Sequence, residues 1–506
     1  MQLSSKHKKC LETKGISEID LRNQLQTFQA GIPFVKILDY AHLGKGIKKL
    51  SNEEEKLYQK IYDHSKAKVI KFIPASGAAS RMFRLVHQFL DKVEVDEKKI
   101  HALLKTQEFS VLNSLISKID KLAFYEQAKA LSKQYYQNFE SHTRIEQAVL
   151  ILKIALSEKG LKLDTLPKGL IPFHHYGQQI LTPFEEHLEE AKSYATKNNK
   201  AQLHFTISKE HESDFKATLK QYLKSHHKEN IDFDVNFSYQ KSSTDTIAVH
   251  LDNTPFRDEN GQLFFRPGGH GALIHNLNAI VADIIFIKNI DNVSKKQVDK
   301  IQTSKNKRIL AGILLNLQQK IFDYQIALKQ NPTSGLIEEV QQFARENLNI
   351  KSPPDKSSEL FKTLHRPIRV CGMVKNDGEP GGGPFWVQGD NGEQSLQIVE
   401  TSQVDPSADD QQQILNDATH FNPVDIVCGV RDFKGQKYDL MQFVNTKRGF
   451  ITQKSVEGQD IKALELPGLW NGGMAYWHSI FVEVPLSTFN PVKTVVDLLK
   501  PAHQQD

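Results

Sequence analysis

Short apolar runs that alternate with amphipathic, charged segments constrain the fold of this chain more than any other feature. Residues 69–73, 203–207 and 233–239 have the length and composition of strands, and a helical pattern follows Glu210. Residues 284–287 are apolar at every position, as expected for a central strand buried on both faces. Strands and helices in this order predict an α/β fold with a doubly wound, mainly parallel sheet.

The rest of the chain divides into segments of contrasting composition. Residues 1–65 are polar with apolar side chains at helical spacing, which predicts a helical N-terminal cap. Residues 66–350 hold the predicted strands and form the core, with a helical insertion over about 86–160. The Pro- and Ser-containing segment 351–358 is typical of a linker. Residues 366–506 are rich in Gly, Val, Asp and aromatic residues, which predicts a β-rich C-terminal domain.

Composition narrows the class of partner. The net charge is +5, from 65 basic and 60 acidic residues, too small an excess to indicate a nucleic-acid partner. It does favour a polyanionic small molecule. Cys10, Cys371 and Cys428 are too few and too far apart for a disulfide framework or a zinc site. The longest apolar stretches fall short of the ~20 residues that span a membrane, and no apolar signal core follows the charged N-terminus. We therefore expect a cytoplasmic protein without a membrane partner.

The loop after the first strand has the composition of a phosphate-binding turn. Ser76, Gly77 and Ala78 are small, so backbone N–H groups can approach an oxygen-rich ligand closely. A following helix would add its positive N-terminal end, and Arg81 supplies a permanent cation able to bind phosphate through two hydrogen bonds. Taken alone, the loop is equally consistent with a tight strand-to-helix turn that carries a surface arginine.

Three later segments add further candidates. Lys168 lies between two prolines, where it can neutralise a phosphate, although it is also one lysine among many. The glycines around Gly269 let the backbone lie against a planar base and ribose, and His270 can donate a hydrogen bond there. Asp291 follows the strand at 284–287, at the edge where open α/β sheets bind ligands, and its carboxylate can hold Mg²⁺. The alternative is that Asp291 caps a helix and that the glycines form a turn.

In chain order, these motifs resemble the sugar nucleotidyltransferase superfamily. Residues 76–81 are similar to its Gly-Gly-x-Gly-Thr-Arg signature, with Ser76, Ala79 and Ser80 departing from the pattern. Residues 167–172 match a Pro-Lys-x-x-x-Pro element. The glycine-rich turn and the Asn-x-Asp-Asn that follows resemble the uridylyltransferase branch, the UDP-sugar pyrophosphorylases. The whole chain is also similar to a long bacterial family of unassigned function.

The resemblance implies further site residues. Gln240 matches a glutamine near the uracil, Glu400 a glutamate that contacts sugar hydroxyls, and Asn422 the asparagine of the family's Gly-Asn-Ile element. Lys493, in Phe-Asn-Pro-Val-Lys, matches a lysine that meets a phosphate. Separately, the Gly- and Trp-rich motifs at 378–386 and 466–477 could form a sugar-stacking floor with Asn471 as a polar contact, or tight turns with core tryptophans.

The implied fold is a Rossmann-like sheet of the nucleotide-diphospho-sugar transferase type. The implied reaction joins a nucleoside triphosphate, preferably UTP, to a sugar 1-phosphate and releases pyrophosphate. In it, Arg81 holds the pyrophosphate, Asp291 holds Mg²⁺, and Lys168 and Lys493 neutralise the reacting phosphates. Two alternatives stay open, namely a glycosyltransferase that uses a finished nucleotide sugar and a nucleotide-sugar-binding protein without activity. The motifs specify neither the sugar nor the oligomeric state.

Overall fold

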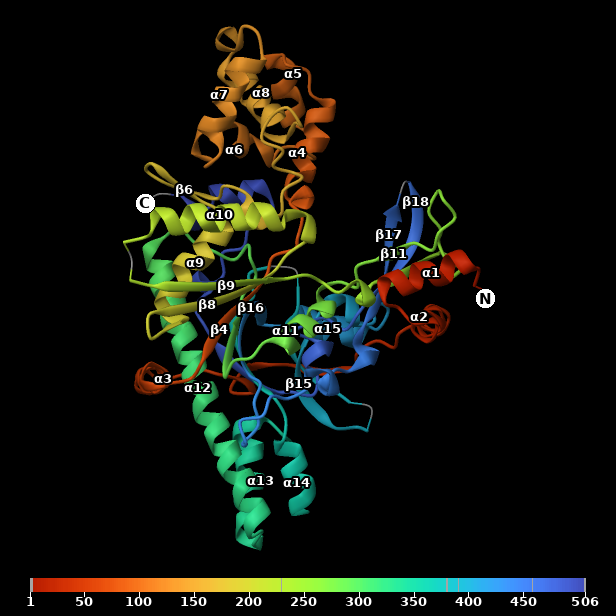
Figure 1. Cartoon of the computed structure of the whole chain (residues 1–506), viewed down its shortest axis with the longest axis vertical. Helices are drawn as coiled ribbons and strands as arrows, with labels where there is room; N and C mark the ends of the chain where they lie inside the picture. Colours follow the sequence, from red (N-terminus) through yellow and green to blue (C-terminus); the bar gives the residue numbers. More distant parts are fainter. Residues whose placement is uncertain (1–2, 229, 379–380, 390, 457, 505–506) are drawn as a thin grey trace. The chain divides into compact units, whose positions relative to one another are not determined.

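The computed structural model describes residues 3–228, 230–378, 381–389, 391–456 and 458–504, and the chain forms two compact units (Figure 1). Unit 1 comprises Met1–Phe72, Ser238–Ile287 and Asn306–Leu486. Unit 2 comprises Ile73–Phe237, Lys288–Lys305 and Ser487–Asp506. Both units are therefore assembled from segments that are distant in sequence. The three-part division predicted from composition follows other boundaries and stays a prediction.

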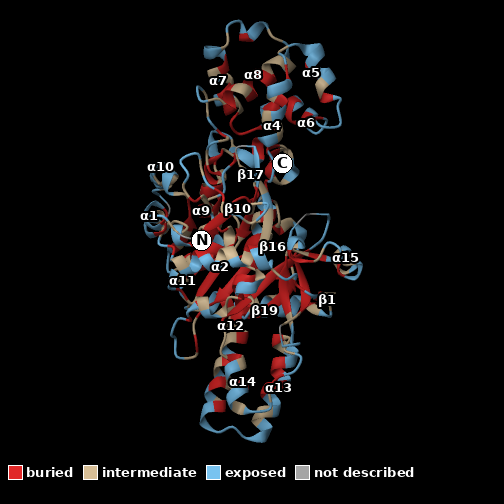
Figure 2. Ribbon diagram, turned by 90° about the vertical axis from the view of Figure 1, so that its right-hand side faces the viewer, coloured by how far each residue is buried: buried red, intermediate tan, exposed pale blue. Residues whose placement is uncertain are grey.

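The main sheet of unit 1 is mixed. Strand β12 pairs in parallel with β4, and β19 pairs in parallel with both β13 and β3. Strand β16 runs antiparallel to both of its neighbours, β12 and β13, so the sheet is not parallel throughout. Strands β16 and β19 are almost entirely buried (red in Figure 2), and all four residues of β12 are buried as predicted. The order is β2 (His42–Leu43), β3 (Gly46–Lys48), β19 (His478–Glu483), β13 (Ile368–Lys375), β16 (His420–Gly429), β12 (Ile284–Ile287) and β4 (Val69–Pro74).

Two smaller sheets complete the strands of unit 1. One has the order β1 (Ile37–Tyr40), β14 (Gly383–Gln388) and β15 (Gln394–Val399). The other has the order β11 (Phe265–Arg266), β10 (Thr246–His250), β18 (Gln459–Glu465) and β17 (Phe450–Val456). The β-rich composition after residue 366 is thus expressed as strands in all three sheets.

The helices of unit 1 lie mainly at the chain's start and between residues 306 and 364. The prediction of a helical N-terminal cap is wrong at residues 37–48, where β1, β2 and β3 form instead. The reason is non-local, because β1 pairs with β14 and buries Ile37 to 1% exposure. The helices are α1 (Ser5–Lys14), α2 (Glu18–Ala30), α3 (Asn52–His64), α11 (Ile274–Ala279), most of α12 (Gln297–Gln330), α13 (Ser334–Leu348), α14 (Ser357–Leu364) and α15 (Asp409–Asn416).

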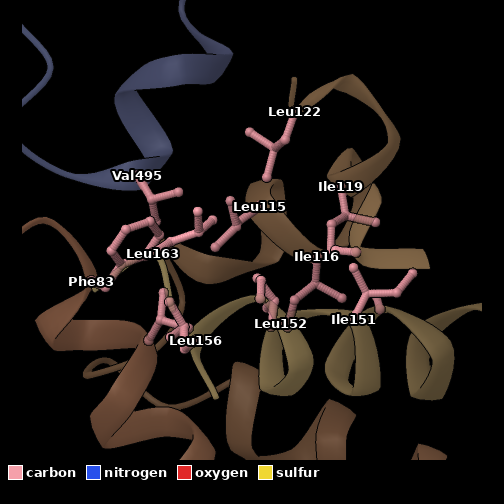
Figure 3. Close-up of a cluster of buried hydrophobic side chains, with 14 of the residues drawn as sticks. Phe83, Leu115, Ile116, Ile119, Leu122, Ile151, Leu152, Leu156, Leu163 and Val495 are labelled. Atoms are coloured by element: carbon pink, nitrogen blue, oxygen red, sulfur yellow. The ribbon is translucent and has the colours of Figure 1, made fainter. Parts of the chain in front are cut away.

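Unit 2 contains a group of helices with its own core. Between α4 (Ser80–Lys92) and α8 (Arg144–Leu156) lie α5 (Glu97–Leu104), α6 (Leu112–Ser117) and α7 (Tyr125–Tyr135), so the 86–160 segment is helical as predicted. Helix α8 is buried around most of its circumference because α4, α5, α6 and α7 pack on it. Figure 3 shows Leu152 and Ile116 in this core, together with Val495 from the C-terminal segment.

The remaining elements of unit 2 follow the sequence pattern closely. Thr182 caps α9 (Pro183–Tyr194), with Pro183 in the first turn, and α10 (Glu212–Ser225) follows Glu210. Strands β8 (Lys200–Thr206) and β9 (Asp232–Ser238) confirm two predicted runs; β5 (His174–Tyr176), β6 (Gln179–Leu181) and β7 (Thr196–Lys197) are short. Residues 168–170 form a single 3₁₀ turn. Among the described residues, no helix is long and apolar enough to cross a membrane.

Candidate functional site

The loop between β4 and α4 exposes its small residues. Ala75 and Ala79 are fully buried at either end, and the Ala75 N–H donates to the Thr206 carbonyl at 2.8 Å. Between them, Gly77 and Ala78 are exposed, and a Cβ placed on Gly77 would meet no atom within 4 Å. Arg81 is exposed in the first turn of α4. The backbone of the loop is therefore accessible, next to an exposed cation and a helix N-terminus.

Lys168 ties this loop to two other segments of unit 2. Its backbone N–H donates to the Gly77 carbonyl at 3.0 Å, and Ala78 forms an antiparallel bridge with Pro167. Its ammonium donates to Asp291 Oδ2 at 2.9 Å and to the Val492 carbonyl at 2.8 Å. The Lys168 and Asp291 side chains are only 15% and 11% exposed. A single lysine thus connects the loop, the aspartate after β12 and the C-terminal segment.

The C-terminal segment is held against Asp291 by its backbone. The Val492 N–H donates to the Asp291 carbonyl at 3.1 Å, and Asn292 forms a bridge with Pro491. Val492 is buried while the next residue, Lys493, is exposed, and the Lys493 N–H donates to Asp497 Oδ2 at 2.9 Å. We call residues 77–81, 166–168, 291–292 and 490–493 the Lys168 cluster. It brings Arg81, Lys168, Asp291 and Lys493 onto adjoining segments.

Sequence reasoning missed a histidine that orients the Asp291 segment. His187, on α9, is fully buried, and its Nε2 lies 3.2 Å from the carbonyl oxygens of both Asn289 and Ile290. An imidazole N–H aimed at two carbonyls fixes the backbone just before Asp291. The signal was available, since a histidine on the buried face of a helix needs a polar partner.

The Lys168 cluster offers one carboxylate to a metal. No group of three or more His, Cys, Asp or Glu side chains is arranged to hold a metal ion within the described ranges. Mg²⁺ is commonly held by one or two carboxylates and otherwise by water and substrate phosphates, so a lone Asp291 fits that mode of binding. It does not fit an ion held by protein ligands alone.

A second group of candidate residues meets in unit 1. His270 Nε2 lies 3.3 Å from Glu400 Oε1, and Asn471 Nδ2 donates to the same oxygen at 3.2 Å. The Leu469 N–H donates to His270 Nδ1 at 3.1 Å, which places the ring proton on Nε2, the nitrogen that lies near Glu400. The Trp470 ring stacks on the imidazole with centroids 4.1 Å apart. We call His270, Glu400, Trp470 and Asn471 the His270 cluster.

The glycine-rich turn at 268–271 packs against residues 465–473. Gly269 has φ +77°, and a Cβ there would lie 2.0 Å from Glu465 Oε2. A Cβ on Gly271 would lie 2.3 Å from the Pro467 carbonyl oxygen. Glycine is thus required at both positions by backbone conformation or by close approach of another segment. Their contact with a base stays a prediction.

Two other predicted residues lie in unit 1, where Gln240 is half-buried and Asn422 is buried. Gln240 Nε2 is buried and has no hydrogen-bond partner among the residues that the structure describes. Asn422 is 3% exposed, and its Oδ1 accepts from the Val424 N–H at 3.1 Å. This bond supports Val424 at φ +59°, a rare conformation for a β-branched residue. Asn422 therefore has a structural role that the sequence did not indicate.

The tryptophans of the Gly- and Trp-rich motifs differ in their surroundings, and their contact with a sugar stays a prediction. Trp386 and Trp477 are each 4% exposed and belong to the core of unit 1. Trp470 and Asn471 instead join the His270 cluster. Gln403 was missed: its Oε1 accepts from Asn471 and from the Glu400 N–H. The three-residue spacing from Glu400 to Gln403 is that of a capping box and could have indicated it.

Comparison with known proteins gives a family but no activity. No curated protein matches the chain. Among solved structures, the chain is similar to a UDP-glucose phosphorylase from Trypanosoma brucei, at 14% identity and TM-score 0.46, with 98% of this chain and 78% of that chain covered. It is also similar to the UDP-glucose pyrophosphorylase of Leishmania major, at 14% identity and TM-score 0.42, with 100% and 80% covered. Because both scores lie below 0.5, a function has to be argued from this chain's own residues. Residues 4–504 match the family described as Domain of unknown function (DUF4301), and the chain belongs to that family.

Proposed function

We propose that this protein is a nucleotidyltransferase that joins a nucleoside triphosphate, UTP by preference, to a sugar 1-phosphate and releases pyrophosphate. One observation carries the proposal. Lys168 contacts the small-residue loop, Asp291 and the segment that bears Lys493. The most distant of these contacts, with Val492, joins residues more than three hundred positions apart in sequence. Three cations, a carboxylate and an exposed loop backbone on adjoining segments suit a triphosphate and a sugar phosphate.

The proposed reaction needs no covalent intermediate. A phosphate oxygen of the sugar 1-phosphate attacks the α-phosphorus, and the bond from that phosphorus to the departing pyrophosphate breaks. Arg81 and the amides of the loop hold the pyrophosphate. Lys168 uses two of its three N–H donors on Asp291 and Val492, so the third can reach a reacting phosphate. Lys493 is exposed and adds a second cation from the neighbouring segment. Catalysis then comes from positioning and charge neutralisation.

Asp291 is the residue that would hold Mg²⁺. When bound, the ion would neutralise phosphate charge, with the phosphates and water supplying its remaining ligands. The Asp291 carboxylate is fixed for this task from two directions, since Lys168 holds Oδ2 and His187 holds the preceding backbone.

The His270 cluster and Gln240 are proposed to bind the base and the sugar. A buried amide N–H without a partner, as on Gln240, suits a carbonyl oxygen of a pyrimidine base. Glu400 can accept hydrogen bonds from sugar hydroxyls, and the Trp470 indole offers an apolar face beside it. Because Asn471 donates to Glu400 Oε1 and His270 Nε2 lies 3.3 Å from the same oxygen, the carboxylate is held in one orientation before a ligand arrives.

The test is pyrophosphate release on mixing UTP, Mg²⁺ and a panel of sugar 1-phosphates with the purified protein. We expect release with at least one sugar, and a stronger thermal shift with UTP than with CTP or GTP. Sugar transfer from a finished nucleotide sugar, without pyrophosphate release, would favour a glycosyltransferase instead. Binding of a nucleotide sugar without turnover in either direction would favour a binding protein. A preference for CTP or GTP would overturn the choice of base.

A further inference from the structure

A cavity of about 430 Å³ lies within unit 1 and is lined by none of the residues proposed above to bind substrate. Its walls come from the end of α13 and the segment after it, from α14, from the start of β15 and from residues 475–479. The volume is within the range of small-molecule binding sites. Among the described residues, its lining carries more basic than acidic side chains.

Arg366 is the central basic group of this cavity, which we call the Arg366 cavity. Burial lowers the pKa of the Arg366 guanidinium, and the nearby Glu393 carboxylate opposes that shift. Among the residues that the structure describes, the guanidinium makes no hydrogen bond or ion pair. A guanidinium that has lost much of its hydration and has gained no acceptor is poised to bind an anion in two-point fashion.

A second arginine, which has no acidic partner among the described residues, lies behind the cavity wall. Arg369 is fully buried, its Nε donates to Ser479 Oγ at 2.8 Å, and its Nη2 has no partner among the described residues. Burial lowers its pKa, and no carboxylate offsets that cost. Because Ser479 accepts from Arg369, its own hydroxyl proton is available as a donor, and Ser479 lines the cavity. The Ser479 hydroxyl, polarised by the buried Arg369 guanidinium, can therefore donate a hydrogen bond to an anion in the cavity.

The remaining charged groups strengthen this asymmetry. Lys351 lines the cavity and its ammonium sits over the Trp386 ring, 4.2 Å from the centroid. His478 is fully enclosed, and burial with the nearby Arg366 charge lowers its pKa to about 3, so its imidazole is neutral at pH 7. Among the described residues of the lining, Glu393 is the one carboxylate. Within the described part of the chain, Lys351 and Arg366 in the lining and Arg369 behind it therefore outnumber the acidic groups.

We propose that the Arg366 cavity is a binding site for a sugar monophosphate, distinct from the Lys168 and His270 clusters. Arg366, Lys351 and the Ser479 hydroxyl receive the phosphate. The volume left beyond a phosphate suits a sugar, whose hydroxyls can bond Asn349, Thr363 and Ser395 of the lining. Arg369 also donates to the Trp470 carbonyl, so a ligand at Ser479 lies two contacts from the His270 cluster. The site does not depend on the proposed reaction.

The experiment is calorimetric titration of the full-length protein with glucose 6-phosphate, glucuronate and glucose. These probes share a ring and differ in bearing a phosphate, a carboxylate or no charge. We expect glucose 6-phosphate to bind more tightly than glucuronate, and glucose not to bind. Removing one charge-assisted contact with Arg366→Gln should raise Kd by about tenfold to a hundredfold. Lys351→Gln, at an exposed position where folding is not at risk, should raise Kd by a smaller factor.

Matched variants separate this site from the one proposed for catalysis. Lys356→Gln removes an exposed lysine five residues beyond Lys351 that does not line the cavity, and it should leave Kd unchanged. Lys168→Gln should also leave it unchanged. Absence of binding to the wild-type protein, equal Kd in the wild type and in both cavity variants, or loss of binding only in Lys168→Gln would each overturn the proposal. Tighter binding of glucuronate would overturn the choice of phosphate.

Discussion

Replacement of Lys168 by methionine tests how much the Lys168 cluster depends on one ion pair. The substitution keeps the length of the stem but removes the ammonium that donates to Asp291 and to the Val492 carbonyl. The Asp291 side chain, which is only 11% exposed, is then left without the cation that pairs with its carboxylate. Leaving one member of a buried pair uncompensated costs about 3–5 kcal/mol. We expect the lower end, about 3 kcal/mol, because both side chains keep some contact with solvent.

Thermal unfolding followed by circular dichroism measures this cost. For a unit of the size of unit 2, about 3 kcal/mol corresponds to a fall in Tm of about 6–12 °C. Lys209→Met, at an exposed lysine of the same unit, is the matched control and should change stability by less than about 0.5 kcal/mol. The double variant Lys168→Met/Asp291→Asn removes the stranded charge and should recover part of the loss.

Two results would refute the reasoning. A Tm for Lys168→Met within 2–3 °C of the wild type would mean that the pair contributes as little as an exposed one, about 0–1 kcal/mol. A double variant that is no more stable than Lys168→Met would mean that the loss does not come from the stranded carboxylate. In that case the backbone bonds of the cluster, and not Lys168, hold the segments together.

Three further predictions concern pH, packing and catalysis. The pKa of His478 is lowered to about 3 in the folded protein, below the unfolded value of 6.5. Its contribution to the free energy of unfolding is therefore complete above pH 6.5 and decreases as the pH falls. At pH 5 this contribution is about 2 kcal/mol smaller. Urea unfolding at pH 7 and 5 should show His478→Gln to be less pH-sensitive than the wild type by that amount, and an equal sensitivity would contradict it. Gly271→Ala places a Cβ 2.3 Å from the Pro467 carbonyl oxygen and should cost about 1–3 kcal/mol in the same assay, whereas Gly77→Ala meets open space and should cost less than about 1 kcal/mol. Arg81→Ala, at an exposed position, should keep the wild-type Tm and lower pyrophosphate release by about 10²–10³-fold; near-normal turnover would remove Arg81 from the proposed mechanism.

The catalytic candidates illustrate what a sequence can indicate about a site. Small residues before Arg81, a proline-flanked Lys168 and an aspartate after a buried strand were each recognisable from local pattern. No local pattern stated that the Lys168 ammonium reaches Val492, because the two residues are separated by most of the chain. Such a contact depends on how the C-terminal segment packs, through Val492 and Val495, on the helices of unit 2.

The glycine-rich turn illustrates a different limit. Its composition allows close approach by another group, and contact with a base stays a prediction. The structure shows that protein atoms also approach closely, since Glu465 and Pro467 lie where Cβ atoms of Gly269 and Gly271 would be. A glycine-rich motif indicates that another group can approach the backbone closely, but it does not identify that group.

The sequence by itself determined the elements whose signal is local. The strands β4 and β12 and the capped start of α9 follow from apolar runs and from Thr182-Pro183, because burial on both faces and helix capping depend on neighbouring residues. Only the tertiary structure decided that residues 37–48 form strands, that β16 runs antiparallel, and that the Lys168 and His270 clusters assemble. Strand pairing and side-chain contact join residues far apart in the chain, and their energy depends on a partner that no local pattern contains.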